Sequence, residues 1–213
     1  MIAGFLLLAL IGYLAGSLTP SIWIGRLIYK KDIRQIGSGN AGATNVYRTL
    51  GWRPALAVMA IDISKGFLPT WFAASLWIGP PDVDVVYLQL LAGIMAVLGH
   101  CYTLFGGFRG GKGVATAGGM MIALFPIVIP FCILVFVVVV WLTRYVSLAS
   151  ICTAISLPIA LFTARYGFDR PLATPLLILG IGIAVFIVFT HRSNVKRLLA
   201  GSESKIGSSG SKD

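Results

Sequence analysis

Three glycine-rich polar segments carry the residue types in this chain that could do chemistry. They span residues 37–45, 106–113 and 191–194. Glycines let backbone amides approach a ligand closely, and amides near the start of a helix bind anions such as phosphate. The second segment holds Arg109 and Lys112 and leads directly into an apolar run, which predicts that a helix begins there. We therefore expect a phosphate site at this segment, and the alternative is a glycine-rich turn with two basic residues.

The first segment supplies small hydrogen-bonding side chains. These are Ser38, Asn40, Thr44 and Asn45, and Arg48 follows shortly after them. Such groups can orient a hydroxyl or bind a phosphate. Ser, Asn and Thr also favour turns and helix starts, and an arginine here could equally mark a cytoplasmic loop, so both interpretations stay open.

In the third segment His191 and Asn194 are three residues apart, which puts them on one face of a helix continuing from the last apolar run. A histidine can act as a base and an amide can stabilise an oxyanion. A lone histidine at the end of an apolar run is more often structural, and the same holds for His100. Asp62 and Lys65 are also three residues apart, within an apolar run. Charges in such a place usually pair, so we expect an internal salt bridge.

Two nucleotide-binding patterns occur, and neither predicts a nucleotide site. Gly37, Gly39 and Gly42 match the dinucleotide pattern, but an apolar helix is expected before them in place of the required β-strand. Residues 106–112 match a P-loop, but Gly113 stands where the Mg²⁺-binding Ser or Thr belongs. No carboxylate cluster or Cys/His ligand set accompanies these segments, so we expect no metal and no cofactor.

The elements that must position these segments are membrane helices. Of the 213 residues 57% are apolar and 11% are charged, and the mean hydropathy is +0.90. A soluble domain is about a quarter charged. The apolar residues come in blocks of about 20, the length with which a helix crosses a bilayer. The three cysteines lie in or beside these blocks and form neither a disulfide framework nor a metal motif.

We therefore expect an all-α integral membrane protein with seven transmembrane helices. The expected spans are about 3–27, 54–78, 84–104, 114–128, 129–143, 146–164 and 172–190. The long apolar block is divided near Pro126 and Pro130 because proline interrupts helical hydrogen bonding, and one long helix is the alternative. Residues 1–205 are expected to form a single domain, and 206–213 a flexible polar tail.

The positions of the charges predict the orientation in the membrane. The chain has 17 Lys and Arg against 7 Asp and Glu, a net charge of +10. Only Arg165 and Arg170 fall on one side of the expected spans, and Lys65 lies within one. The positive-inside rule then puts the N-terminus outside and the C-terminus in the cytoplasm. Topology accounts for the basicity, so we expect no nucleic-acid partner.

The three segments together resemble one family, the bacterial membrane acyl-phosphate:glycerol-3-phosphate acyltransferases. The motifs that carry the resemblance are residues 37–51, 99–116 and 191–203, with further matches at 62–66 and 144–150. Two positions depart from the pattern of the family. Thr103 stands where proline is usual, and Arg109 stands where lysine is usual and keeps the charge.

The resemblance implies transfer of a fatty acyl group from acyl phosphate to the 1-hydroxyl of glycerol 3-phosphate. The products would be lysophosphatidic acid and phosphate, in the first step of phospholipid synthesis. The site would face the cytoplasm from the bacterial inner membrane, and a soluble acyl-phosphate-forming enzyme would be an upstream partner. The alternative function is a transporter or channel for a phosphorylated solute.

The resemblance also implies roles for the residues singled out above. The catalytic candidates are Ser38, His191 and Asn194, and the phosphate-binding candidates are Thr44, Asn45, Arg48, Gly110, Gly111, Lys112 and Gly113. Acyl phosphate is a mixed anhydride with a good leaving group, so covalent catalysis is unnecessary, and the sequence shows no nucleophile–base–acid triad. The base would be His191 or an oxygen of the substrate phosphate.

Overall fold

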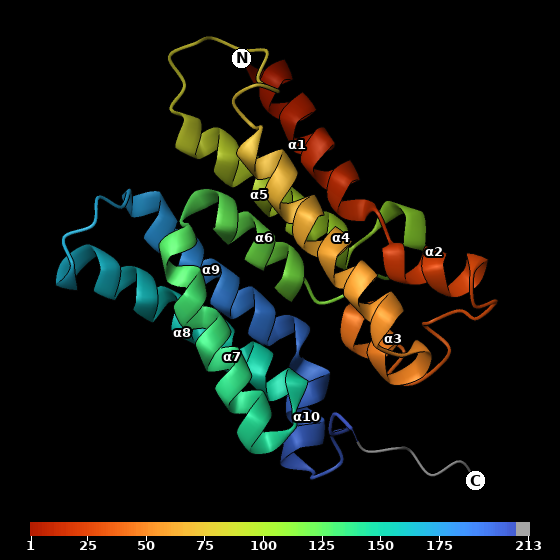
Figure 1. The fold of residues 1–213 in the computed structure, drawn as a ribbon. Helices are drawn as coiled ribbons and strands as arrows, with labels where there is room; N and C mark the ends of the chain where they lie inside the picture. Colours follow the sequence, from red (N-terminus) through yellow and green to blue (C-terminus); the bar gives the residue numbers. More distant parts are fainter. Residues whose placement is uncertain (208–213) are drawn as a thin grey trace, which may run out of the picture. The chain divides into compact units, whose positions relative to one another are not determined.

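The computed structural model describes residues 1–207, and all regular structure in that range is helical (Figure 1). The all-α prediction is therefore confirmed. The chain is divided into two compact units, Met1–Pro126 and the part from Ile127 onward. Most of the tail predicted at 206–213 lies outside the described residues, which end at Gly207.

The first unit contains the helices α1 (Ile2–Ser17), α2 (Pro20–Leu27), α3 (Ala43–Leu50), α4 (Trp52–Trp71), α5 (Val85–Cys101) and α6 (Val114–Leu124). Within it α1 packs along α5, and α4 packs on α5 and α6 (Figure 1). Small residues allow this approach. A Cβ on Gly12 would lie 2.5 Å from the carbonyl oxygen of Ala92, and one on Gly66 would overlap the carbonyl oxygen of Thr116. Close contacts at small residues are typical of membrane helices.

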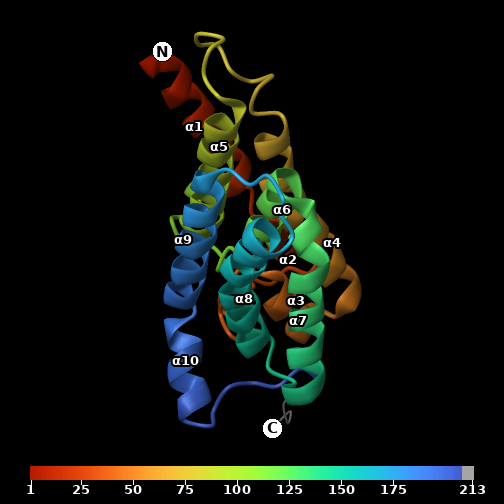
Figure 2. The ribbon, with the colours of Figure 1, turned by 90° about the vertical axis from the view of Figure 1, so that its left-hand side faces the viewer.

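The second unit contains α7 (Ile129–Thr143), α8 (Val146–Gly167), α9 (Thr174–Thr190) and α10 (Arg192–Leu199). Figure 2 shows α8 between α7 and α9, in agreement with its packing on both. The axes of α9 and α10 differ by 60°. The prediction that the last span continues as one helix through Asn194 is therefore wrong, because the chain bends at His191, which ends α9 and precedes α10.

Proline sets two of the helix boundaries. The first predicted span is interrupted after Ser17, and α2 restarts at Pro20, which has no N–H to continue the helical hydrogen bonds. The predicted division near Pro126 is confirmed, since a 3-10 turn at Pro126–Val128 precedes α7. The stretch 28–53 lies between the first two expected spans and was expected to hold no helix, which is wrong in part because α3 forms within it.

Four segments of the described chain are both long and apolar enough to cross a membrane. They are Ile2–Leu27, Val85–Gly106, Pro126–Thr143 and Val146–Gly167, and a fifth results if α9 and α10 are one bent span. The helix α4 has 20 residues but includes Asp62 and Lys65, which lower its hydropathy, and α6 has only 11 residues. The membrane class is thus supported, and the full count of seven spans stays a prediction.

Candidate active site

One carboxylate organises the loop between α2 and α3. Asp32 accepts hydrogen bonds from Arg34 Nε (3.1 Å) and Nη2 (3.0 Å) and from Arg26 Nη2 (2.7 Å). The bonds from Arg34 contribute most to holding the pKa of Asp32 well below its usual range, against the opposing effect of burial. Arg34 also donates from Nη1 to the carbonyl oxygen of Gly106 at 2.7 Å. This bond ties the loop that precedes the first glycine-rich segment to the start of the second.

Asn45 holds the first glycine-rich segment in shape. Its Oδ1 accepts the amide of Ser38 at 2.8 Å, and its Nδ2 donates to the carbonyl oxygens of Ile33 (2.8 Å) and Ile36 (3.0 Å). The side chain is 1% exposed. Both of its N–H groups are therefore committed to the backbone. Asn45 is thus placed to position Ser38, and its expected role in binding phosphate stays a prediction.

The other candidates of the first segment lie at its surface or on α3. Ser38 is exposed, whereas Thr44 and Arg48 are half-buried. Thr44 and Arg48 are four residues apart on α3 and so share one face of that helix. A hydroxyl and a guanidinium on one face, beside the start of a helix, suit an anionic ligand.

In the second segment, Gly110 and Gly111 return the chain to the end of α5. The amide of Gly110 donates to the carbonyl oxygen of Cys101, and the amide of Gly111 donates to that of His100, both at 3.1 Å. A Cβ on Gly110 would overlap the carbonyl oxygen of His100. One on Gly111 would overlap His100 Nε2 and lie 3.1 Å from the carbonyl oxygen of Ala41. The close approach of this segment to the end of α5 therefore requires glycine at both positions.

The second segment ends at the start of α6, as the sequence predicts. Gly113 has a φ of 84°, in the left-handed region that favours glycine, and it immediately precedes Val114, the first residue of α6. Lys112 is half-buried beside it, whereas Arg109 is exposed. Lys112 thus comes directly before the turn that opens α6, and a basic residue beside the amides of a helix start is a combination that binds phosphate.

A buried charge cluster lies directly behind this segment. Asp62 and Lys65 are 2% and 5% exposed, and their Oδ1 and Nζ atoms are 2.8 Å apart. The predicted internal salt bridge is therefore confirmed. Lys65 Nζ also donates to the carbonyl oxygen of Leu18 at 2.7 Å, and His100 Nδ1 lies 3.4 Å from the same oxygen of Asp62.

In the second unit, Glu203 gathers three side chains. Its Oε1 accepts hydrogen bonds from Asn194 Nδ2 and Ser147 Oγ, both at 2.8 Å, and its Oε2 accepts one from Arg197 Nε at 2.7 Å. Burial tends to raise the pKa of this carboxyl, but the bonds from Asn194, Ser147 and Arg197 together hold the pKa of Glu203 below its usual value. A carboxylate only accepts, so it also fixes which end of the Asn194 amide points toward it.

His191 sits at the junction of α9 and α10 with one ring nitrogen committed. Its Nδ1 lies 2.8 Å from the carbonyl oxygen of Ile187. Because a carbonyl only accepts, Nδ1 carries the proton, and Nε2 is the acceptor atom of the neutral ring. The side chain is 3% exposed. A histidine in this tautomer has the acceptor nitrogen that a general base needs.

The structure thus groups the predicted residues within each unit. In the first unit Gly111 of the segment 106–113 lies near Ala41 of the segment 37–45, since an added Cβ would be 3.1 Å from the Ala41 carbonyl oxygen. Arg34, just before the first segment, bonds to Gly106. In the second unit His191 and Asn194 lie within one turn of each other, with Glu203 against Asn194. Glu203 was not a candidate from the sequence, because an acidic residue in a basic tail is usually solvated. Within residues 1–207 no group of three His, Cys, Asp or Glu side chains could hold a metal ion.

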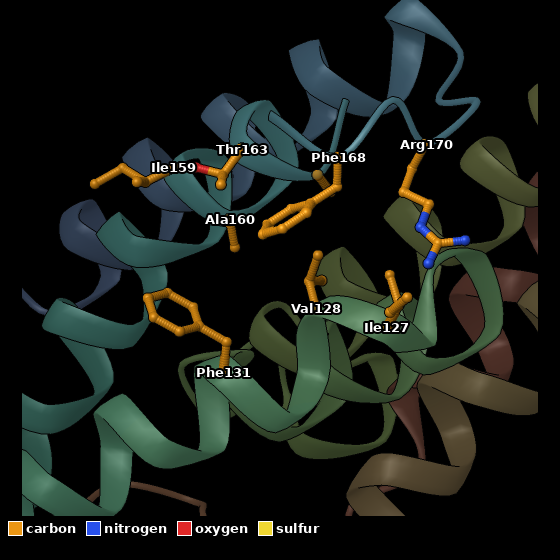
Figure 3. A pocket seen from close by; sticks show the side chains of 9 residues that line it. Ile127, Val128, Phe131, Ile159, Ala160, Thr163, Phe168 and Arg170 are labelled. Atoms are coloured by element: carbon orange, nitrogen blue, oxygen red, sulfur yellow. The ribbon is translucent and has the colours of Figure 1, made fainter. Parts of the chain in front are cut away.

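A separate apolar pocket of about 410 Å³ lies within the second unit (Figure 3). Its lining includes Phe131, Ile159, Phe168 and Arg170. Ile159 follows Ser147 by twelve residues along α8, which corresponds to about 18 Å at the helical rise. The pocket is therefore not part of the Glu203 cluster.

Comparisons with known proteins agree with one another. Residues 6–201 match the family model described as glycerol-3-phosphate acyltransferase. A glycerol-3-phosphate acyltransferase of Chlorobium luteolum is 42% identical over 92% of this chain and 94% of the relative. One of Chlorobaculum tepidum is 41% identical over 95% of this chain and 96% of the relative.

The fold is similar to solved structures of PlsY, an integral membrane glycerol 3-phosphate acyltransferase. The glycerol 3-phosphate form of PlsY superposes with a TM-score of 0.84 at 41% identity, covering 95% of this chain and 96% of that chain. The lysophosphatidic acid form gives a TM-score of 0.81 at 40% identity, covering 95% of both chains.

Proposed function

The chain belongs to the glycerol-3-phosphate acyltransferase family, and we propose that it takes the acyl group from acyl phosphate. The predicted resemblance is confirmed, and the chain is an integral membrane acyltransferase. In the proposed reaction the 1-hydroxyl oxygen of glycerol 3-phosphate bonds to the acyl carbonyl carbon, and the bond from that carbon to the phosphate oxygen breaks. Lysophosphatidic acid and inorganic phosphate leave. The two forms of the solved relative, with glycerol 3-phosphate and with lysophosphatidic acid, support this acceptor and product.

One observation carries the proposed phosphate site: the Gly110–Gly113 loop, which ends at the start of α6 with Lys112 beside it. Both substrates carry a phosphate, so this loop and Arg48 of α3 would supply binding groups for phosphate, and we assign the loop to the phosphate of glycerol 3-phosphate. Thr44 lies on the same face of α3 as Arg48 and would donate its hydroxyl to a phosphate oxygen. A rival transporter would need no such loop at one end of a helix, since transporter sites usually lie at broken helices near the midplane.

The acceptor hydroxyl must be oriented and must lose its proton. Ser38 would orient it, and the Asn194 amide, held by Glu203 at 2.8 Å, would stabilise the oxyanion that develops on the acyl carbonyl. The proton would pass to His191 Nε2 or to an oxygen of the substrate phosphate. No covalent enzyme intermediate is needed, because phosphate is a good leaving group.

The substitution His191→Gln separates the two bases. Glutamine keeps a hydrogen-bonding group but cannot take up a proton near neutral pH. If the substrate phosphate is the base, the variant keeps a substantial fraction of kcat, and its pH–rate profile has the limbs of the wild type. If His191 is the base, kcat falls to the level of His191→Ala, and the profile loses a limb in the range where histidines titrate.

The proposed arrangement has seven spans, an external N-terminus and a cytoplasmic C-terminus, with the active site at the cytoplasmic face of the inner membrane. One domain, residues 1–205, would carry both units. The charge distribution supports this, since only Arg165 and Arg170 fall on the external side. Asp82 and Gly207 are both exposed. A thiol reagent added to intact cells should label Asp82→Cys and should reach Gly207→Cys only after the membrane is opened, whereas the reverse pattern would contradict the topology.

The donor is tested on detergent-purified protein. Synthetic acyl phosphate is mixed with the protein, with and without glycerol 3-phosphate, and released phosphate and lysophosphatidic acid are both measured. Acyl-CoA replaces acyl phosphate in a parallel arm. We expect equal amounts of the two products, only with acyl phosphate and only when glycerol 3-phosphate is present. Acyl transfer from acyl-CoA at a comparable rate would refute the proposed donor. In the cell, a soluble enzyme that forms acyl phosphate would supply this substrate.

A further inference from the structure

We propose that His100, held in place by Asp62, is a positioning residue. It sets how close the Gly110–Gly113 loop comes to α4, and so positions the loop for the phosphate of glycerol 3-phosphate. The inference rests on the proposed function of that loop. It concerns side chains that the reaction itself does not use. His100 is the penultimate residue of α5 and is 5% exposed.

The first support is the place of His100 between the buried charges and the loop. Its Nδ1 lies 3.4 Å from Asp62 Oδ1, whereas its Nε2 faces Gly111, where an added Cβ would overlap it. The imidazole therefore spans the distance from the carboxylate on α4 to the backbone of the loop. The next group that an added Cβ on Gly111 would meet is a backbone atom, the carbonyl oxygen of Ala41 at 3.1 Å.

The second support is that the main chain of His100 and its neighbour also holds the loop, through hydrogen bonds. The His100 carbonyl oxygen accepts the amide of Gly111 at 3.1 Å, and the next carbonyl, of Cys101, accepts the amide of Gly110. These are carbonyls of the last turn of α5, which have no partner within the helix. The loop is thus fixed at the His100 main chain by hydrogen bonds and at the His100 side chain by direct contact.

The third support comes from the electrostatics of the cluster. Asp62 and Lys65 already neutralise each other at 2.8 Å, so the cluster does not need His100 for charge balance. His100 Nδ1 is buried without an aligned hydrogen bond in the described residues. Asp62 Oδ1 lies 3.4 Å from it, and Lys65 Nζ approaches the same oxygen at 2.8 Å. The carboxylate therefore favours the tautomer with the proton on Nδ1 and turns the Nε2 edge toward the loop.

The consequence for the reaction follows from how backbone amides bind phosphate. The Gly110 and Gly111 amides are bonded to α5, so the amides offered to phosphate are those at the start of α6, which have no partner within the helix. Such amides bind well only when several point at the same place, and a displacement of about 1 Å can cost about two orders of magnitude in rate. A side chain that limits how far the loop can sink toward α4 therefore acts on the binding of glycerol 3-phosphate. It acts much less on the acyl donor chain, which contacts apolar surface.

The test compares three variants at position 100 with one control. His100→Leu keeps volume without polar atoms, His100→Gln restores a polar group that can reach Asp62, and His100→Ala opens the space next to Gly111. Val97→Ala is the control, because Val97 is 6% exposed on α5 one turn before His100. KM for glycerol 3-phosphate, KM for acyl phosphate and kcat are measured separately, and thermal unfolding in detergent reports on folding.

We expect His100→Leu to raise KM for glycerol 3-phosphate about tenfold, with KM for acyl phosphate changed less than about twofold. His100→Gln should bring the first KM back to within about threefold of the wild type, and Val97→Ala should leave it unchanged. An unchanged KM for glycerol 3-phosphate in a folded His100→Leu protein would overturn the inference. So would equal rises for both substrates.

A double-mutant cycle keeps the inference testable if His100→Leu does not fold. The methyl of Gly111→Ala would overlap Nε2, so His100→Ala should relieve part of its effect. The KM of the double variant for glycerol 3-phosphate should fall short of the product of the two single effects by at least about threefold. Multiplication of the two effects would contradict contact between these residues.

Two further arms separate this inference from the proposed function. Wild-type protein that releases no phosphate in response to glycerol 3-phosphate would refute the function itself. A normal KM for glycerol 3-phosphate in Lys112→Ala would refute the phosphate loop. If the wild type is active and Lys112→Ala raises KM for glycerol 3-phosphate, the function and the phosphate loop are both supported. His100 variants that then behave like Val97→Ala would refute the positioning role alone.

Discussion

The two units differ in how their candidate functional groups are built. In the first unit the candidate phosphate site is made largely of main chain, with Gly110 and Gly111 packed on the end of α5 and Gly113 at the start of α6. In the second unit the candidate catalytic groups are side chains, with Asn194 and Ser147 held by the Glu203 carboxylate.

This difference determines which changes each unit tolerates. A main-chain site is sensitive to volume, because one added methyl meets the backbone or the ring packed against it. A side-chain network is sensitive to the loss of one polar atom, because the partner is then left buried and unsatisfied. Substitutions in the first unit should therefore weaken substrate binding, and those in the second should slow the chemical step.

The largest effect is expected at Asn194, in the side-chain network. If its amide stabilises the oxyanion, Asn194→Ala should lower kcat by about 10²–10³-fold with little change in KM, the size of effect seen when one oxyanion donor is removed. Ser193→Ala is the matched control, because Ser193 is the exposed neighbour on the same helix. A rise in KM for glycerol 3-phosphate at normal kcat would instead make Asn194 a binding residue and remove the contrast between the two units.

A smaller effect is expected at Glu203, which holds Asn194 without being proposed to touch substrate. Glu203→Gln keeps the volume but replaces an acceptor oxygen by a donor that faces Asn194, Ser147 or Arg197. We expect kcat to fall about 10- to 100-fold, less than for Asn194→Ala, since the amide is misaligned but still present. A fall larger than that of Asn194→Ala would show that Glu203 acts on the substrate directly.

The same carboxylate predicts a pH dependence of stability. Hydrogen bonds hold the pKa of Glu203 below its unfolded value of 4.5 despite burial. Its stabilising contribution is therefore complete above about pH 4.5 and is lost as the pH falls through the lower folded pKa. Thermal unfolding between pH 6 and pH 3 should show a loss of stability in the wild type that is smaller in Glu203→Gln. An identical change of unfolding temperature with pH in the two proteins would contradict this.

What could be predicted from the sequence follows the same division. The second glycine-rich segment could be recognised because glycine, lysine and a following apolar run are adjacent in the chain. The Asp62–Lys65 pair could be predicted because its two residues are one helical turn apart. Glu203 was not readable, because its bond to Ser147 joins residues 56 positions apart. No periodicity marks such a contact.

Asn45 illustrates a different limit of the sequence. Its type and position suit a ligand-binding amide, but short polar side chains also reach the backbone of their own loop. Here the Asn45 amide bonds to the backbone of Ser38, Ile33 and Ile36, and whether it also contacts phosphate stays a prediction. The helix α3 was missed because its eight residues are largely polar and lie between Gly42 and Gly51, which makes the stretch resemble a loop.

In the main-chain site, Gly111→Ala should raise KM for glycerol 3-phosphate about tenfold and leave kcat within about threefold. The added methyl would overlap His100 Nε2 and crowd Ala41, so the loop must move. Gly118→Ala is the matched control, because a Cβ there meets nothing within 4 Å and alanine favours a helix over glycine. Normal kinetics in a well-folded Gly111→Ala protein would reduce this glycine to a turn residue.

The smallest kinetic effect is expected at Thr103, the position where the family usually has proline. Thr103 is fully buried, and its Oγ1 donates to the carbonyl oxygen of Ser17 at 2.6 Å, at the interruption between α1 and α2. Thr103→Val keeps the shape but leaves that carbonyl without this donor, which should cost about 1–3 kcal/mol of unfolding free energy. Thr103→Ser keeps the hydroxyl and should lose less. Both variants should have wild-type KM for glycerol 3-phosphate, because the loop is held by the carbonyl groups of His100 and Cys101 at the end of α5. A raised KM for glycerol 3-phosphate in Thr103→Val alone would mean that the junction after α1 also positions the Gly110–Gly113 loop. The main-chain site would then extend beyond α5 and α6.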